Sequence, residues 1–443
     1  MGEEHSTIEL RVCDSAGQPL VARALLFSEG WRFSRAAFTD AAGCATFSDI
    51  PPQPLSLEVD RGPLWSRYIG ALDVRPGERI SRRVVLERLC DPRLYGYYPG
   101  DPHVHSLYSD GRQTPQEIAH AARAADLSWC ALTDHDTMDG AQEWLACADE
   151  AFLPIVGEEV STGAGHILVL GASGEVRGAD NADEEQMQRI FAEARALGGA
   201  VFVAHPNFPV PELSFRFWNT EGFHGLEVVH QGSLPPMPPA PAQPDLQAEE
   251  LFFELLEQGR RLAPLAGSDC HDTTNELQRE GLRDPRAALS RIPEYVAVLE
   301  AVGLARMKLW ARQGNAVGTQ RTYARAHALS REEILAALVA GRTVVSNGPF
   351  LLVESAAGQG PGDVIRGEGS ELVFFLRAWF NRPLRHVSVR AGREVVRRVA
   401  LGGRVSAEVE VTLPAETCRG QPLLFQLYAD EPYSALAAPI YVE

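Results

Sequence analysis

Two histidines separated by one residue are the first feature of this chain that could do chemistry. They lie in the segment Asp101-Pro102-His103-Val104-His105. Side chains two residues apart on a strand point to the same side, so His103 and His105 could bind one metal ion together. Such a pair alone is a weak signal, and its meaning depends on what accompanies it.

Further metal-capable side chains follow, most of them directly after a short apolar run. They are Asp110, His135 in Thr133-Asp134-His135-Asp136, Glu159 or its neighbour Glu158, His166, His205 in Ala204-His205-Pro206, and Asp269 and His271 in Ser268-Asp269-Cys270-His271. Taken singly, each has an ordinary explanation, such as an Asp-Gly turn at Asp110 or a buried core histidine at His205. Six successive segments that end this way predict instead a site for divalent cations.

Two nearby residues, His230 and Arg321, have two possible interpretations each. His230 closes the apolar run Val228-Val229, where it either contacts a substrate or packs in the core. Arg321 either binds an anionic substrate or forms a surface ion pair. Cys270 points away from its two neighbours, which indicates packing rather than metal binding.

The elements that must position these residues have the pattern of an α/β domain. From about residue 95 to residue 347, short apolar runs alternate with helical stretches, and about 250 residues of this kind match a barrel, whose chemistry gathers at the strand ends. The Pro-rich stretch 234–241 interrupts the pattern and is interpreted as a surface loop or a lid. Helix starts are predicted at the capping boxes Thr114-Pro115-Gln116-Glu117 and Ser330-Arg331-Glu332-Glu333.

The flanking segments have a different pattern, with period-two alternation broken by turns. The pattern predicts short strands in residues 6–90 and again from about residue 350 to residue 443. It therefore favours a small β-sandwich at each end. The predicted organisation is therefore multidomain, with an N-terminal β-sandwich (1–94), a central barrel (95–349) and a C-terminal β-sandwich (350–443).

Composition excludes several classes of function. A formal net charge of −18 argues against a scaffold for nucleic acid, although a local cation cluster could still attract a small anion. The 7 cysteines form no CxxC pair, which favours reduced core thiols. No apolar run spans a bilayer, and residues 1–6 lack the features of a secretory signal, so a cytoplasmic location is expected unless a signal was trimmed.

The series HxH, Asp, TDHD, GxE, His, AHP and GSDxH resembles that of the PHP superfamily, named after polymerase and histidinol phosphatase domains. Within it the chain looks like the CehA/McbA-like metal-dependent hydrolases, which carry a similar Ser346-Asn347-Gly348-Pro349 segment and flanking β modules. The resemblance covers about residues 95 to 350. It implies a distorted (β/α)7 barrel and two or three divalent ions, namely zinc, manganese or iron.

The resemblance also implies a ligand set for each ion. Its GxE spacing selects Glu159 over Glu158 as the bridging carboxylate. One ion is expected on His103, His105, Asp269 and Glu159, a second on Glu159, His166 and His205, and a third on Asp110, His135 and His271.

We therefore predict a phosphoesterase that uses a metal-bridging hydroxide, with Asp269, His271 and Glu159 as catalytic residues. His230 and Arg321 are the predicted contacts to a small anionic substrate, and the oligomeric state stays open. The first alternative keeps the metal site but hydrolyses a carboxyl ester, carbamate or amide. The second is a non-catalytic binding or surface module, and a nuclease comes third because the chain is acidic and has no basic, aromatic-lined groove.

Overall fold

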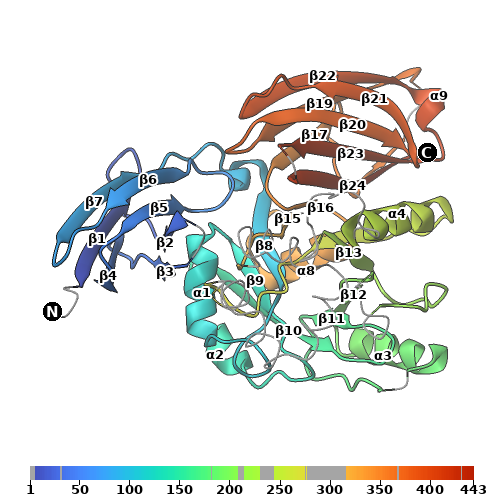
Figure 1. Ribbon diagram of the computed structural model, residues 1–443. Coiled ribbons are helices and arrows are strands. Elements are labelled where there is room, and N and C mark those ends of the chain that lie inside the picture. The colour runs from blue at the N-terminus through green and yellow to red at the C-terminus, as the bar shows by residue number, and fades with distance from the viewer. Residues whose placement is uncertain are drawn as a thin grey trace.

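The computed structural model describes residues 5–29, 32–180, 182–207, 214–229, 244–274, 276, 316–366, 369–430 and 432–443, with only the backbone of 244–247. The predictions for His230 and for the Pro-rich stretch 234–241 lie outside the described residues. Figure 1 shows the N-terminal strands in blue to one side of the central strands and the C-terminal strands in red above them. Within the described residues, no helix combines the length and the hydropathy that crossing a bilayer requires.

The N-terminal part consists of two sheets around one core. The first sheet has the order β4 (Cys44–Ile50), β1 (Ser6–Cys13), β7 (Arg79–Val85), and the second has the order β3 (Ser34–Phe38), β2 (Arg23–Phe27), β5 (Pro54–Asp60), β6 (Tyr68–Asp73). The shared core includes Ile8, Leu10, Leu26 and Leu57, all at most 3% exposed. Alternate residues of β1 and β5 are buried, as the period-two pattern requires.

The central strands form one continuous run. Their order is β14 (Ala263–Ala266), β13 (Gly225–Val229), β12 (Ala200–Val203), β11 (Ile167–Leu170), β10 (Leu153–Val160), β9 (Trp129–Leu132) and β8 (Tyr97–Val104). All pairs are parallel except those of β11, which runs antiparallel to both β10 and β12. The strands are buried on both faces and read as near-continuous apolar runs, as strands covered on both sides do.

This run bends round without forming a closed ladder. The first half of β8 pairs with β15 (Arg321–Arg325) in antiparallel register, from Thr322 opposite Gly100 to Arg325 opposite Tyr97. Its last residues turn to the segment after β14, where an isolated bridge joins Val104 to Cys270. The two ends therefore meet through a few hydrogen bonds, and a closed seven-stranded barrel stays a prediction.

Helices flank the central strands, and two of them, α1 (Pro115–Ala124) and α8 (Arg331–Val339), start at the predicted capping residues. The others are η2 (Pro92–Tyr95), α2 (Ala141–Leu145), α3 (Glu184–Ala196) and α4 (Pro244–Glu257). Thr114 and Glu117 form the predicted capping box of α1. At α8 only half of the predicted box forms, because Ser330 accepts from Glu333 N while the Glu333 carboxylate accepts from the backbone of His327.

The C-terminal part is not separated from the centre in the way the sequence suggested. Strand β16 (Thr343–Ser346) pairs with β24 (Ser434–Val442), so the central sheet continues through β24, β23 (Pro422–Ala429), β20 (Leu384–Ala391) and β21 (Glu394–Ala400), with β18 (Val364–Ile365) beside β24. A second sheet has the order β17 (Phe350–Ser355), β19 (Glu371–Trp379), β22 (Ser406–Pro414), and α9 (Ala415–Cys418) follows β22. The two sheets share a core that includes Leu351, Phe374, Val387 and Phe425.

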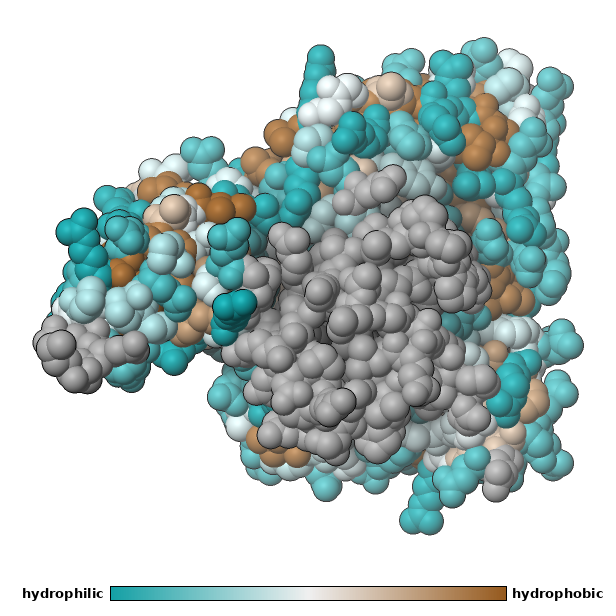
Figure 2. Space-filling model, viewed as in Figure 1, coloured by the Kyte–Doolittle hydropathy of each residue, from teal (hydrophilic) through white to brown (hydrophobic). Residues whose placement is uncertain are grey.

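The outward faces of the N- and C-terminal sheets are mainly polar. On the side drawn in Figure 2, hydrophilic residues dominate both parts, and hydrophobic residues form small separate groups. This distribution agrees with the burial of the apolar side chains in the two cores.

Candidate metal centre

The metal-capable side chains come from the same end of the central strands. His103 is the residue before the last in β8, and Glu159 is the residue before the last in β10. His166 directly precedes β11, and because β11 is antiparallel to β10, its start lies at the same end. His205 and Asp269 follow β12 and β14 by two and three residues.

Glu159 lies at the centre of the cluster, where its carboxylate contacts several histidines. Its side chain is buried, and its two oxygens face different histidines. Oε2 lies 3.0 Å from His103 Nε2 and 3.1 Å from His105 Nε2. Oε1 lies 2.8 Å from His205 Nε2 and 3.0 Å from His166 Nδ1. One carboxylate therefore reaches two pairs of imidazoles, which is the geometry of a bridging ligand.

Asp269 contacts the same two histidines, His103 and His105, as Glu159 Oε2 does. Its Oδ1 lies 3.0 Å from His105 Nε2 and 3.4 Å from His103 Nε2, and it is also 3.5 Å from His271 Nδ1. The ligand atoms of His103, His105, Glu159 and Asp269 all lie within 4.8 Å of one another. This is the set that the family resemblance implied for the first ion.

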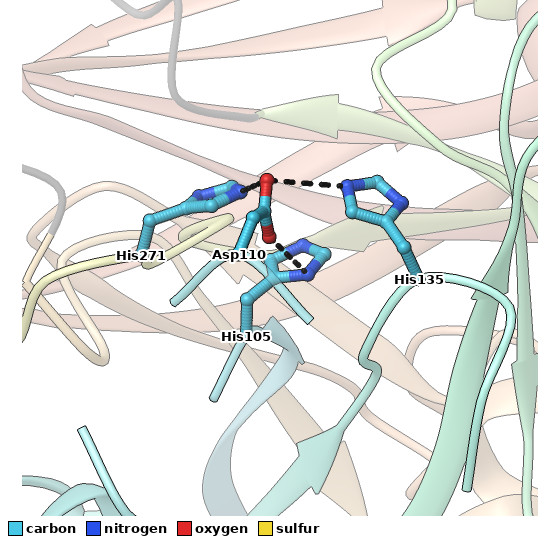
Figure 3. A group of neighbouring side chains, drawn as sticks. All are labelled: His105, Asp110, His135 and His271. Atoms are coloured by element: carbon cyan, nitrogen blue, oxygen red, sulfur yellow. Dashed lines mark ion pairs between the residues drawn. The ribbon is translucent and has the colours of Figure 1, made fainter. Parts of the chain in front are cut away.

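Asp110 gathers a second group at the solvent edge, as Figure 3 shows. Its Oδ2 lies 3.1 Å from His271 Nε2 and 3.7 Å from His135 Nε2, while its Oδ1 lies 3.6 Å from His105 Nδ1. The Asp110 side chain is 54% exposed, whereas His105 is buried. The group contains the three residues expected for the third ion and adds His105 to them.

The third group differs in one member from the expected one. The ligand atoms of His135, Glu159 and His166 lie within 4.8 Å of one another, so His135 as well as His205 lies beside Glu159. His205 still reaches the same Glu159 oxygen as His166. The sequence pattern could not separate these two histidines, because both follow strands at the same end of the sheet.

Two of these residues have unusual backbone conformations. His205 and Asp269 have φ values of 23° and 52°, in a region that non-glycine residues rarely adopt. Asp269 is fixed there by a hydrogen bond from its N–H to His103 O at 2.9 Å. Such strain is typical of residues whose position is set by function and held by their surroundings.

The charges of the cluster are strongly coupled. Burial lowers the pKa of His105, but the hydrogen bonds that His105 donates to Asp269 and Glu159 outweigh it and raise the pKa to about 10. Burial would raise the pKa of Glu159 and of Asp269, yet the surrounding histidines hold both well below their usual range. His135 behaves differently, because burial dominates and lowers its pKa to about 4. The carboxylates of Glu159 and Asp269 are therefore ionised at neutral pH, as carboxylate ligands of a metal ion are.

The orientation of the imidazole rings is independent evidence that the side chains of this cluster fit divalent cations. His103 Nδ1 lies 3.1 Å from Glu227 Oε1 and His271 Nδ1 lies 2.9 Å from the backbone oxygen of Asp269, so both nitrogens donate outward. Their Nε2 lone pairs are then left facing the cluster, in the arrangement that metal-binding histidines adopt. His103 Nε2 and His105 Nε2 are only 3.1 Å apart, and a cation between them would relieve this crowding.

Two supporting carboxylates were not predicted from the sequence. Glu227 is 0% exposed on β13 and accepts from His205 N at 2.8 Å while it faces His103. Asp101 is 0% exposed and accepts from the N–H groups of His103, Ser268 and Gly318. The available signal was an acidic residue within an otherwise apolar strand, because such a buried charge needs partners.

Gly267 is required by the same packing. A Cβ at this position would lie 2.5 Å from Glu227 Oε1 and 2.5 Å from His103 Cβ. No side chain fits there without moving the ligand histidine or its supporting carboxylate. Steric crowding therefore explains why a glycine occupies the first position of the GSDxH segment.

The structure places the remaining predicted residues outside the cluster. Glu158 faces away from Glu159 and accepts from Val176 N at 2.7 Å. Asp134 accepts from Ser106 and Ser109, and Asp136 accepts from Ser161 N, so both support loops. Cys270 is buried and serves packing, as expected.

Arg321 is not brought to the cluster. It is 3% exposed, and its guanidinium donates to the backbone oxygens of Gly318 and Ala125 rather than forming a surface ion pair. The reason is the alternation of β15, whose next residue Thr322 bonds to Ala266 on the opposite face. The geometry does not support the predicted contact between Arg321 and a substrate.

Part of the chain that contains this site is similar to known proteins. Residues 101–194 match the PHP domain. The PHP match includes the residues from His103 to His166, whereas His205, Asp269 and His271 lie beyond it. The narrower resemblance to CehA/McbA-like hydrolases stays a prediction.

Two curated proteins are similar over short stretches. A 5'-3' exoribonuclease of Haemophilus influenzae is 41% identical over 63 residues, which cover 14% of this chain and 23% of that protein. A 3',5'-nucleoside bisphosphate phosphatase of Chromobacterium violaceum is 42% identical over 76 residues, covering 16% and 27%. The similarity thus spans about a quarter of each relative. A two-domain protein with a predicted PHP-like metal-dependent phosphoesterase from Bacteroides vulgatus has 16% identity and a TM-score of 0.41, covering 75% of this chain and 91% of that one.

Proposed function

We propose that this protein is a metal-dependent phosphoesterase that hydrolyses small phosphate esters. The observation that carries the proposal is the convergence of five histidines on Glu159, within 3.5 Å of its two oxygens. The PHP match supports a hydrolase of this kind. The names of both curated relatives, an exoribonuclease and a nucleoside bisphosphate phosphatase, support a phosphate ester as substrate.

The proposed ions lie in the groups that the side chains define. His103, His105, Glu159 and Asp269 would hold one, Asp110, His135 and His271 a second, and Glu159, His166 and His205 a third. Divalent ions bound there would supply a nucleophile by lowering the pKa of water and would stabilise the charge on the phosphoryl oxygens. The carboxylates of Asp110, Glu159 and Asp269 carry about −3 against about +6 from three such ions, so a bound anion would be favoured.

The chain's own residues would orient the substrate from the open side. His103 and His105 are buried at the base, whereas the side chains of Asp110, His135 and His271 are 54%, 25% and 19% exposed. A phosphate ester would therefore approach over these three residues. The His271 ring is held by its bond to the Asp269 backbone, which keeps Nε2 aimed at the approaching group.

A substrate panel tests the reaction class. We expect the manganese- or zinc-loaded protein to hydrolyse p-nitrophenyl phosphate or a nucleotide, including a nucleoside 3',5'-bisphosphate, and to leave aryl carbamates intact. Release of inorganic phosphate or of the aryl alcohol would be measured at equal enzyme concentration. Turnover of carbamates without any release of phosphate would instead favour the carboxyl ester, carbamate or amide hydrolase.

The role of Glu227 gives a second prediction. In Glu227→Gln the amide nitrogen or oxygen faces His103 in place of a full negative charge, so the imidazole becomes a weaker ligand. We expect metal affinity to fall about 10- to 100-fold, measured by competition with a chromophoric chelator. Glu193→Gln on α3, where the carboxylate pairs only with exposed Arg189, is the matched control. Equal affinities for the two variants would show that Glu227 does not support the site.

A further inference from the structure

A cavity lies at the opposite end of the central strands from the metal centre. Its volume is about 400 Å³, and its lining includes Tyr95, Arg325, His327, Arg342 and Asp363. Arg325 pairs in register with Tyr97 at the start of β8, whereas His103 is near the end of that strand. Six residues at a rise of about 3.3 Å separate the two sites by roughly 20 Å.

The two arginines of this cavity are in different electrostatic states. Arg325 is compensated, because its Nη2 donates to Asp363 Oδ2 at 2.5 Å and to Pro361 O at 3.2 Å. The Arg342 guanidinium is different. Its Nε is buried without a hydrogen-bond partner, and within the described parts of the chain its guanidinium forms no ion pair. Burying an unsatisfied cationic donor is costly, so such a group is expected to serve a ligand.

The surroundings of Arg342 favour an oxyanion. Arg325, His327 and Arg342 come from β15, from the residues after it and from the start of β16, so they converge from neighbouring strands. Arg325 and Asp363 cancel, which leaves one guanidinium charge in a chain whose net charge is −18. A guanidinium presents a planar fork that matches phosphate oxygens.

The volume indicates that the ligand carries more than its anionic group. A cavity of about 400 Å³ has the size of a small-molecule site and exceeds a bare phosphate ion several-fold. Tyr95 supplies an aromatic wall, and its ring is fixed by stacking on Trp379 at 5.5 Å. We propose that this cavity binds a small organic phosphate, with Arg342 holding the phosphate group and Tyr95 lying against the organic part.

Binding of phenylphosphonate and of inorganic phosphate to the metal-loaded full chain tests this site, because neither can be hydrolysed. Calorimetry is expected to resolve a binding event that Arg342→Gln weakens at least about tenfold and that Glu159→Gln leaves in place. Arg342→Lys, which keeps the charge but not the planar fork, should weaken it less. Phenylphosphonate should bind more tightly than inorganic phosphate at this site.

Arg82→Gln on β7 is the control, since Arg82 is exposed and bonds only to the backbone of its neighbour. Equal thermal midpoints for the wild type and the Arg342 variants would show that the fold is intact. The proposal is overturned if Arg342→Gln and Arg82→Gln bind both anions alike, or if all binding disappears in Glu159→Gln. Because it tests a different residue set, its failure leaves the proposed phosphoesterase untouched.

Discussion

Replacing Glu159 with glutamine is expected to lower phosphate release by more than about a hundredfold, because loss of a mere supporting partner of a metal ligand already costs 10- to 100-fold. Glu159 faces five histidines, and no other side chain in the described cluster touches as many. An amide has one acceptor oxygen and no charge, so it cannot bridge the two pairs of imidazoles. The measurement is kcat/KM for p-nitrophenyl phosphate in manganese- or zinc-saturated enzyme.

Glu158→Gln is a close control, because it changes the same residue type one position away. The Glu158 carboxyl points to the other face of β10, where burial raises its pKa to about 7 and where it accepts from Val176 N. Glutamine keeps that acceptor, so activity should stay within about twofold of the wild type. If both variants lost activity equally, a general effect on the strand would replace the bridging role of Glu159.

Asp126→Asn is expected to destabilise the protein by about 3–5 kcal/mol, the usual cost of removing one partner from a buried ion pair. Asp126 lies between the N-terminal part and the central strands, with its side chain 9% exposed. Its carboxylate faces Arg61 at 3.3 Å, Arg93 at 3.4 Å and Arg88 at 3.6 Å, and it accepts from Trp65 Nε1 at 2.9 Å. Asparagine keeps the Trp65 bond but removes the negative charge that faces the three arginines, of which Arg88 and Arg93 still pair with Asp91.

The pH dependence of this effect has a definite sign. Burial would raise the pKa of Asp126, but the three arginines outweigh it and hold the pKa below its usual value. A depressed folded-state pKa stabilises the protein above the unfolded value of about 3.9, and this contribution is lost as the pH falls through the folded-state pKa. The difference between wild type and Asp126→Asn should therefore be full at pH 7 and shrink in strong acid.

Urea unfolding at pH 7 and below pH 4 would measure that difference. Glu58→Gln is the reference, because it removes the exposed pair between Glu58 and Arg67, and such pairs are worth about 0–1 kcal/mol. A loss for Asp126→Asn no larger than that for Glu58→Gln would show that the network does not hold the two parts together.

Local patterns explain why the positions of the site residues could be predicted. Most of the ligands lie at or just after the end of a short apolar run, and the order of those runs along the chain is enough to place His103, His135 and Glu159 at one end of the strands. Because neighbouring residues of a strand face opposite sides, only one of Glu158 and Glu159 was expected to face the cluster, and the family resemblance selected Glu159. The capping box of α1 could also be predicted from local sequence, because its hydrogen bonds join residues three positions apart.

Contacts between distant segments could not be read in this way. The pairing of β16 with β24 joins residues about ninety positions apart, and its register depends on the packing of both cores. Glu227 supports His103 across 124 residues, and nothing near it in the sequence indicates that partner. Arg321 shows the converse, since a promising residue type near the site faces the other side of its strand.

Metal content of the purified full chain tests the central claim most directly. After reconstitution with manganese or zinc and removal of excess ion, elemental analysis should find two to three equivalents in the wild type and in Glu158→Gln, and clearly fewer in Glu159→Gln. Less than one equivalent in the wild type, or equal content in all three proteins, would contradict a multinuclear centre built on Glu159.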